Sequence, residues 1–165
     1  LIDKMRSKSP QLPFTSINPS LLLRQVQKEK FPSIKTVVDV FFVNMKPLAC
    51  IVQFGKKPNN KTIFIHEILN RIETPLLVLE HIITHEFIHI LIKEREIDGK
   101  LSSHPPEFWE EEKKLSPNRQ LAWNWIFANF FGIIINDKKN EETKVHRLWK
   151  KNFVNDIIPL DQITE

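Results

Sequence analysis

Three histidines and a glutamate lie within one short stretch of the chain, THEFIHILIKEREIDGKLSSHPPEFWE, which begins at Thr84. His85 and His89 are four residues apart, so on a helix their imidazoles share one face and can reach one metal ion. Such a pair supplies two of the four tetrahedral ligands of zinc. Glu86 is rotated by roughly 100° around the helix axis, where its carboxylate need not bind the metal but can take a proton from a zinc-bound water. The pattern predicts a zinc hydrolase centre.

The helix around this pattern is apolar almost all round. Pro75 is typical of a first helical turn and Asp98–Gly99 of a stop, so we expect one helix from about residue 75 to the middle 90s. A helix of this kind lies buried in the core, where polar side chains must find partners. A zinc ion would satisfy the histidines; the alternative is that they bond to backbone carbonyls and that the glutamate forms a salt bridge.

A third ligand must follow a reversal of the chain. Asp98–Gly99 supplies the turn, and His104 follows it, just before two prolines and the Phe108–Trp109 pair. A histidine fixed by prolines and anchored by aromatic side chains is a candidate ligand, with an exposed loop histidine as the alternative. Glu107 and Glu110 are the fallback ligands, because a carboxylate can replace a third imidazole at zinc.

His81 extends the histidine stripe, since residues 81, 85 and 89 are spaced by four. The outer two lie about 12 Å apart along a straight helix, which is too far for one tetrahedral ion. Of the two possible histidine pairs, only the His85–His89 pair has a glutamate directly after its first member. We therefore expect His81 to pack in the core or to lie next to the ligands without binding the metal.

The HEFIH of residues 85–89, the fifteen-residue step from His89 to His104 and the HPPEFW of residues 104–109 resemble the SprT-like metalloprotease domain. That domain includes the Spartan proteases and is related to the YgjP-type metal hydrolases. The resemblance covers roughly residues 37–127 and implies a zincin-like fold with zinc bound by His85, His89 and His104 and with Glu86 as the general base. The chain departs from the family at Pro105, where a glycine is common, and in having no cysteine-rich zinc ribbon.

Three segments predict a small antiparallel sheet packed against the active-site helix. Residues 36–45 and 48–54 are rich in β-branched and aromatic side chains, and Lys46–Pro47 between them suits a tight turn, so we expect a hairpin. Residues 61–66, KTIFIH, alternate well enough for a third strand. We place that strand at the edge of the sheet, where an extended peptide substrate could add to it.

The whole chain, residues 1–165, is expected to form one domain of the α+β class. Asn18 and Pro19 mark the start of a helix that includes LLLRQVQKEK. Further helices are expected at residues 105–115, from Ser116–Pro117 to Gly132, and at residues 141–152. Residues 1–18 form a loose lead-in, and residues 133–165 form a basic C-terminal extension without an assigned role.

Composition suits a globular domain, with 165 residues of which 41% are hydrophobic and 27% charged. The apolar run of residues 121–135 holds two asparagines and falls short of the roughly 18 residues that span a bilayer, so no membrane contact is expected. Cys50 is the single cysteine, which excludes an internal disulfide framework. With no secretory signal at the start, a cytoplasmic location is expected.

The expected activity is zinc-dependent hydrolysis of peptide bonds in a protein or peptide substrate. Basic segments at residues 1–30 and 136–152 flank an acidic one at residues 93–112, and the net charge is +4. The basic ends allow contact with DNA, which would weaken steeply with added salt. Two alternatives remain open: a zinc-containing module that binds nucleic acid or protein, and a zinc hydrolase of non-peptide amides.

Overall fold

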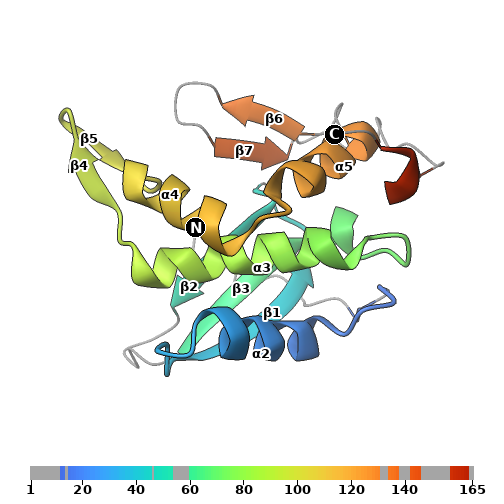
Figure 1. Cartoon of the computed structure of the whole chain (residues 1–165), viewed down its shortest axis with the longest axis horizontal. Helices are drawn as coiled ribbons and strands as arrows, with labels where there is room; N and C mark the ends of the chain where they lie inside the picture. Colours follow the sequence, from blue (N-terminus) through green and yellow to red (C-terminus); the bar gives the residue numbers. More distant parts are fainter. Residues whose placement is uncertain are drawn as a thin grey trace.

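The computed structural model has the α+β class predicted from the sequence (Figure 1). It describes residues 12–13, 15–45, 47–53, 60–130, 134–137, 142–145 and 157–163, and of residues 134–137 and 142–145 only the backbone. The elements in chain order are α2 (Pro19–Lys30), β1 (Val37–Val43), β2 (Ala49–Gln53), β3 (Asn60–His66), η1 (Glu67–Leu69), α3 (Leu76–Leu91), β4 (Arg95–Ile97), β5 (Lys100–Ser102), α4 (Pro106–Leu115), α5 (Arg119–Phe130), β6 (Ile134–Asp137), β7 (Glu142–Val145) and η3 (Leu160–Gln162).

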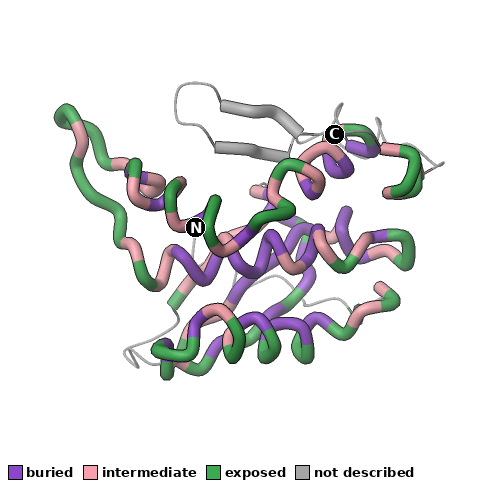
Figure 2. The backbone as a smooth tube through the Cα atoms, viewed as in Figure 1, coloured by how far each residue is buried: buried purple, intermediate pink, exposed green. Residues whose placement is uncertain are grey.

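Helix α3, which carries the HExxH residues, runs through the middle of the described structure. Helix α2 lies beside it, strands β2 and β3 contact it, and α4 and α5 also pack against it. Val78, Leu79, Ile83, Phe87 and Ile88 are fully covered by these neighbours, and most of the helix is buried (Figure 2). A helix that is apolar all round is stable when it has neighbours on every side. The prediction of a buried helix is confirmed.

The three-stranded sheet has the order β1-β3-β2, with β1 parallel and β2 antiparallel to β3. The prediction of an antiparallel sheet is therefore wrong for β1, and β1 and β2 do not form the expected hairpin. The placement of KTIFIH at the edge is also wrong, because β3 lies between the other two strands. Four consecutive residues of β3 are buried, as is typical of a strand covered on both faces, whereas the residues of β2 are all partly or fully exposed.

Helix α3 ends at Leu91, earlier than the middle 90s predicted from the sequence, and Ile92 already has extended backbone. The Asp98–Gly99 pair does not stop the helix but forms the turn of the β4–β5 hairpin. Its φ angles are 49° and 74°. Positive φ at both central residues is the two-residue hairpin turn that an Asp-Gly sequence favours. The reversal expected before His104 is thus present, as a hairpin.

Other predicted elements form as expected or need correction. The Asn18 side chain accepts hydrogen bonds from the backbone N–H groups of Ser20 and Leu21 and so caps α2, and α4 and α5 lie where they were predicted. The helix predicted at residues 141–152 is wrong for residues 142–145, which pair with β6 as strand β7. Residues 146–152 and most of the lead-in lie outside the described residues.

The apolar run near the end of the chain contributes to the core. Within the described part of it, α5 buries Ala122, Trp125, Ile126 and Phe130. None of the helices that the structure describes is long and apolar enough to cross a membrane.

Candidate metal centre

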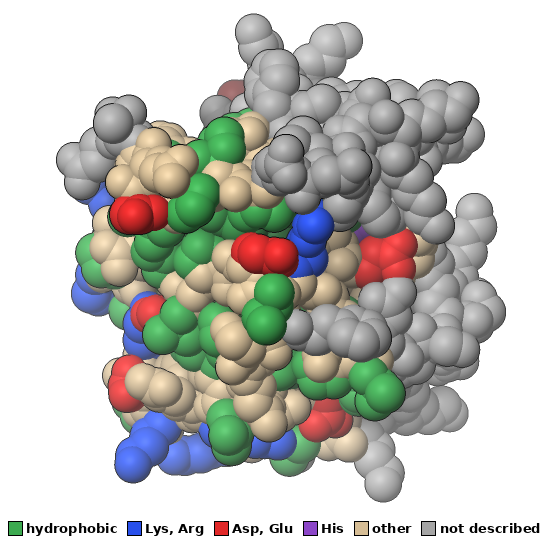
Figure 3. All heavy atoms as spheres, turned by 90° about the vertical axis from the view of Figure 1, so that its right-hand side faces the viewer, with side chains coloured by type: hydrophobic (Ala, Val, Ile, Leu, Met, Phe, Trp, Pro, Cys, Tyr) green, Lys and Arg blue, Asp and Glu red, His purple; other side chains and the backbone are tan. Residues whose placement is uncertain are grey.

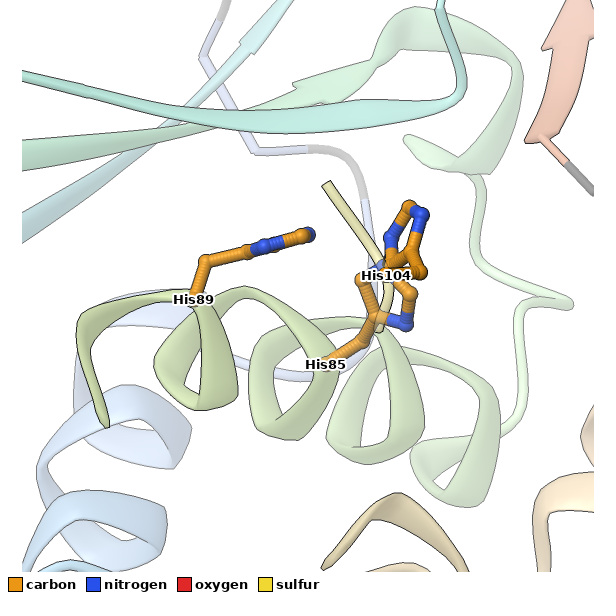
Figure 4. Close-up of side chains that lie close together, drawn as sticks. All are labelled: His85, His89 and His104. Atoms are coloured by element: carbon orange, nitrogen blue, oxygen red, sulfur yellow. Dashed lines mark hydrogen bonds between the residues drawn. The ribbon is translucent and has the colours of Figure 1, made fainter. Parts of the chain in front are cut away.

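The structure brings His85, His89 and His104 together, with one nitrogen of each ring within 4.8 Å of the others. The first two project from the same side of α3, and the third approaches them from the segment that follows β5 (Figure 4). The Nε2 atoms of His85 and His104 are 3.1 Å apart. Among the described residues no other group of histidine, cysteine or carboxylate side chains has this geometry.

The donor set fits a zinc ion. Two nitrogens bound to one tetrahedral zinc, each at 2.0–2.1 Å, would be about 3.3 Å apart, close to the separation of the His85 and His104 Nε2 atoms. Burial, together with the charge of His85, lowers the pKa of His89 to about 3 and that of His104 to about 4. Both rings are therefore neutral near pH 7, which is the form that binds metal.

Phe108 is the common support of the three histidine rings. Its ring centroid lies 4.9 Å from that of His85, 4.6 Å from that of His89 and 4.6 Å from that of His104. The phenylalanine is completely buried in the first turns of α4. Because closely packed rings lose rotational freedom, Phe108 holds the imidazoles near one another.

The fallback ligands of the sequence analysis lie outside the cluster. The Glu107 carboxylate forms an ion pair with Arg95 at 2.8 Å, and both side chains are about half exposed. Glu110 is exposed on α4. His104, rather than either carboxylate, is thus the third side chain that meets the helix pair.

Glu86 is buried next to the cluster, on the side of α3 that faces strand β2. Burial raises the pKa of its carboxyl to about 7, while the charge of His85 and the backbone N–H of Ile51 act in the opposite direction. The contact with Ile51 places this carboxyl at the edge strand of the sheet. Glu86 therefore lies between the histidine cluster and an edge strand of the described sheet.

Glu112 is the polar residue of the centre that sequence reasoning missed. Its Oε1 lies 2.6 Å from Nδ1 of His85, and the side chain is 1% exposed. Burial alone would raise its pKa, but the hydrogen bond from His85 and the nearby positive charges lower the pKa to about 2. The sequence held one signal for this residue: Glu112 follows Phe108 by four positions, which places both side chains on the same face of α4.

His81 stays out of the cluster, as the sequence analysis expected. Its Nδ1 lies 2.8 Å from the hydroxyl of Ser116, and its ring packs edge-on against Trp123. Its Nε2 has no hydrogen-bond partner among the described residues. Burial, together with the charges of His85 and other neighbours, lowers the pKa of His81 to about 4, although Glu112 raises it. This histidine packs in the core as a neutral ring.

Replacing His81 by glutamine should make the stability of the zinc-free protein less sensitive to acid. Between pH 6.5 and 4 the unfolded chain binds a proton at His81 that the folded chain does not, so stability falls as the pH falls. At pH 4.5 this one ring lowers the free energy of unfolding by about 2–3 kcal/mol. Urea unfolding of both proteins at pH 7.5 and 4.5 measures the difference, and equal pH dependence in the two would contradict the expectation.

Two described basic residues of α2 lie beside acidic side chains. Lys30 of α2 lies 2.6 Å from Glu80 of α3, and Arg24 lies 4.0 Å from Asp39. Much of the predicted basic ends, residues 1–11, 14, 138–141 and 146–152, lies outside the described residues. Contact with DNA stays a prediction.

A shallow cavity of about 450 Å³ lies at the opposite end of α3, on a face where apolar side chains gather (Figure 3). Ile17, Ile72 and Leu76 are among its lining residues. Leu76 precedes the ligand pair by nine to thirteen residues, which is about 14–20 Å along the helix. The cavity is therefore separate from the histidine cluster.

Comparison of the chain with family models, with curated proteins and with solved structures found no match. The function of the chain is therefore inferred from the geometry of the centre itself.

Proposed function

We propose that this protein is a zinc-dependent metallopeptidase of the SprT-like kind, with a zincin-like arrangement around α3. The observation that carries the proposal is the convergence of His85, His89 and His104, whose nitrogens lie within 4.8 Å of one another. Three imidazoles suit a catalytic zinc site, which has three protein ligands and leaves a fourth position open. A buried carboxyl next to them, Glu86, is what distinguishes a hydrolytic centre from a bare metal site.

A zinc ion held by these histidines would polarise the scissile carbonyl and lower the pKa of water towards about 7. The Glu86 carboxylate takes the proton of the attacking water and then donates it to the nitrogen of the leaving amine. Burial raises the affinity of this carboxyl for a proton, so it can hold the proton between the two transfers. Phe108 and the buried face of α3 keep bulk water away from the inner side of the site.

The substrate of this proposal is an extended peptide that lies along β2. Of the two edge strands in the described sheet, β1 and β2, it is β2 that contacts Glu86, in place of the β3 edge expected from the sequence. Glu86 contacts the backbone N–H of Ile51, in the middle of β2. A peptide that adds to this edge through main-chain hydrogen bonds would present its carbonyl groups next to Glu86.

Metal content and proteolysis, measured on the full chain, test this function. We expect one zinc ion per chain by elemental analysis and cleavage of an unfolded protein such as casein. Removal of the metal with 1,10-phenanthroline should abolish cleavage, and one equivalent of zinc should restore it. A zinc-bound protein that cleaves neither casein nor a peptide library would instead favour a zinc-containing binding module or a hydrolase of other amides.

A further inference from the structure

A continuous set of contacts behind the histidine cluster connects two of its members through α4 and α5. It runs from His85 to Glu112, to Arg119, to Trp109 and to His104. Glu112 and Trp109 belong to α4, and Arg119 is the first residue of α5. None of these three side chains is among the residues to which the proposed chemistry was assigned.

The first arm of this set fixes which nitrogen of His85 is free. A carboxylate has no hydrogen to donate, so the 2.6 Å contact between Glu112 and His85 requires that Nδ1 carries the proton. In the neutral imidazole, the form that binds metal, the lone pair is then on Nε2, the atom that faces Nε2 of His104. Glu112 thus selects the tautomer that presents a metal-binding atom to the cluster.

The second arm holds the ring of His104. The indole of Trp109 stacks on that ring, with centroids 5.1 Å apart and an angle of 29° between the planes. The guanidinium carbon of Arg119 in turn lies 5.6 Å from the centroid of the Trp109 ring. The same guanidinium group donates a hydrogen bond from Nε to Oε2 of Glu112. One arginine therefore contacts both Glu112, which holds His85, and Trp109, which stacks on His104.

The position of Arg119 has a local cost that this role explains. A cation in the first turn of a helix is disfavoured, because the helix N-terminus carries partial positive charge. Helix α5 has no acidic residue in its first turn to compensate. The compensation comes from Glu112 of the neighbouring helix, whose side chain is 1% exposed. The pair thus forms across two helices, at the place where both supports meet.

We propose that Glu112 and Arg119 are positioning residues that preset the metal centre before an ion binds. Glu112 fixes the tautomer and direction of His85, and Arg119 holds both Glu112 and the Trp109 ring that stacks on His104. The inference rests on the proposed metal site and adds that α4 and α5 form its preassembled support. Carboxylates that hold a ligand histidine in this way contribute to metal affinity.

Zinc affinity of Glu112→Gln, measured by competition with a chromogenic chelator, tests the first arm. The amide has the same shape, but it can donate to Nδ1 and so favour the other tautomer of His85. We expect the zinc dissociation constant to rise about 10–100-fold. The matched control is Glu111→Gln, the same change at the preceding residue of α4, whose carboxylate pairs with Lys114. Its dissociation constant should stay that of the wild type.

Two further measurements separate positioning from charge and from folding. Long-range ¹H–¹⁵N spectra of the zinc-free wild type should show the Nδ1–H form of His85, and Glu112→Gln should shift the ring towards the Nε2–H form. Arg119→Lys keeps the charge but loses the planar group that contacts Glu112 and Trp109 together. It should raise the zinc dissociation constant by a smaller factor, and its side chain is 40% exposed, so the variant is expected to fold.

The outcomes distinguish this inference from the proposed function. A wild-type protein that binds no zinc removes the function and the inference together. A wild type that binds zinc while folded Glu112→Gln binds it equally well overturns the inference alone, as does the Nε2–H form of His85 in the zinc-free wild type. If Glu112→Gln shows no cooperative thermal transition, the test passes to Arg119→Lys. An unchanged zinc affinity of Arg119→Lys, together with an unchanged His85 spectrum, then overturns the inference.

Discussion

Glu86→Gln is expected to lower the rate of peptide hydrolysis by about 10²–10⁴-fold, the usual contribution of a general acid–base group, while zinc stays bound. The amide has nearly the same shape but cannot take a proton from water. It should be tolerated in the fold, because the Glu86 site is buried and already disfavours a charge. Casein cleavage measured with one equivalent of zinc gives the rate, and elemental analysis gives the metal content.

The control for this variant is Glu80→Gln, the same change in the same helix. Glu80 pairs with Lys30 and lies outside the histidine cluster, so its loss should leave cleavage and zinc content near those of the wild type. Unchanged cleavage by folded Glu86→Gln would remove the proposed mechanism. Loss of zinc from Glu86→Gln would show that this residue binds the metal instead of water.

His104→Gln is expected to weaken zinc binding on the order of 100-fold. Structural zinc sites with four ligands bind with about 10–16 kcal/mol, or roughly 3 kcal/mol for each ligand, and an amide is not among the usual zinc ligands. The substitution also removes the ring that stacks on Trp109. Competition with a chelator measures the dissociation constant, and cleavage should fall with it at limiting zinc.

His81→Gln provides the matched control for the ligand assignment. His81 lies one helical turn before His85 and its ring meets that of His85 edge-on, yet its Nδ1 lies beside the Ser116 hydroxyl and it supplies no nitrogen to the cluster. Zinc affinity should therefore be retained in this variant. If His81→Gln loses zinc and His104→Gln keeps it, the ligand set would be the continuous stripe on α3, and the assignment of His104 would be wrong.

The local elements of this protein are largely a consequence of local sequence. Asn18 and Pro19 begin α2 because the amide side chain caps free N–H groups and proline suits the first turn. Asp98–Gly99 reverses the chain because both residues tolerate positive φ. The end of α3 was misplaced because the same two residues are also typical of a helix stop.

The meeting of the three histidines was predictable for a related reason. The interval of four between His85 and His89 places both on one side of any helix. The turn before His104 directs the chain back towards α3. Phe108, which is fully buried against the histidine rings, anchors the chain there. The helical spacing is a short-range relation that holds on any α-helix, whereas the return of His104 also needs α4 to pack against α3.

Strand order and the support of the metal centre were decided by tertiary structure. Nothing local distinguishes β2 from β3 as the central strand, because both are apolar and of β type; the choice depends on which one is covered on both faces. Glu112, Arg119 and Trp109 likewise gain their roles only when α5 packs beside α4. The sequence by itself determined that His85 and His89 share one face of a helix, through their spacing of four. Only the packing of distant segments decided which strand edge faces Glu86 and which carboxylate holds His85.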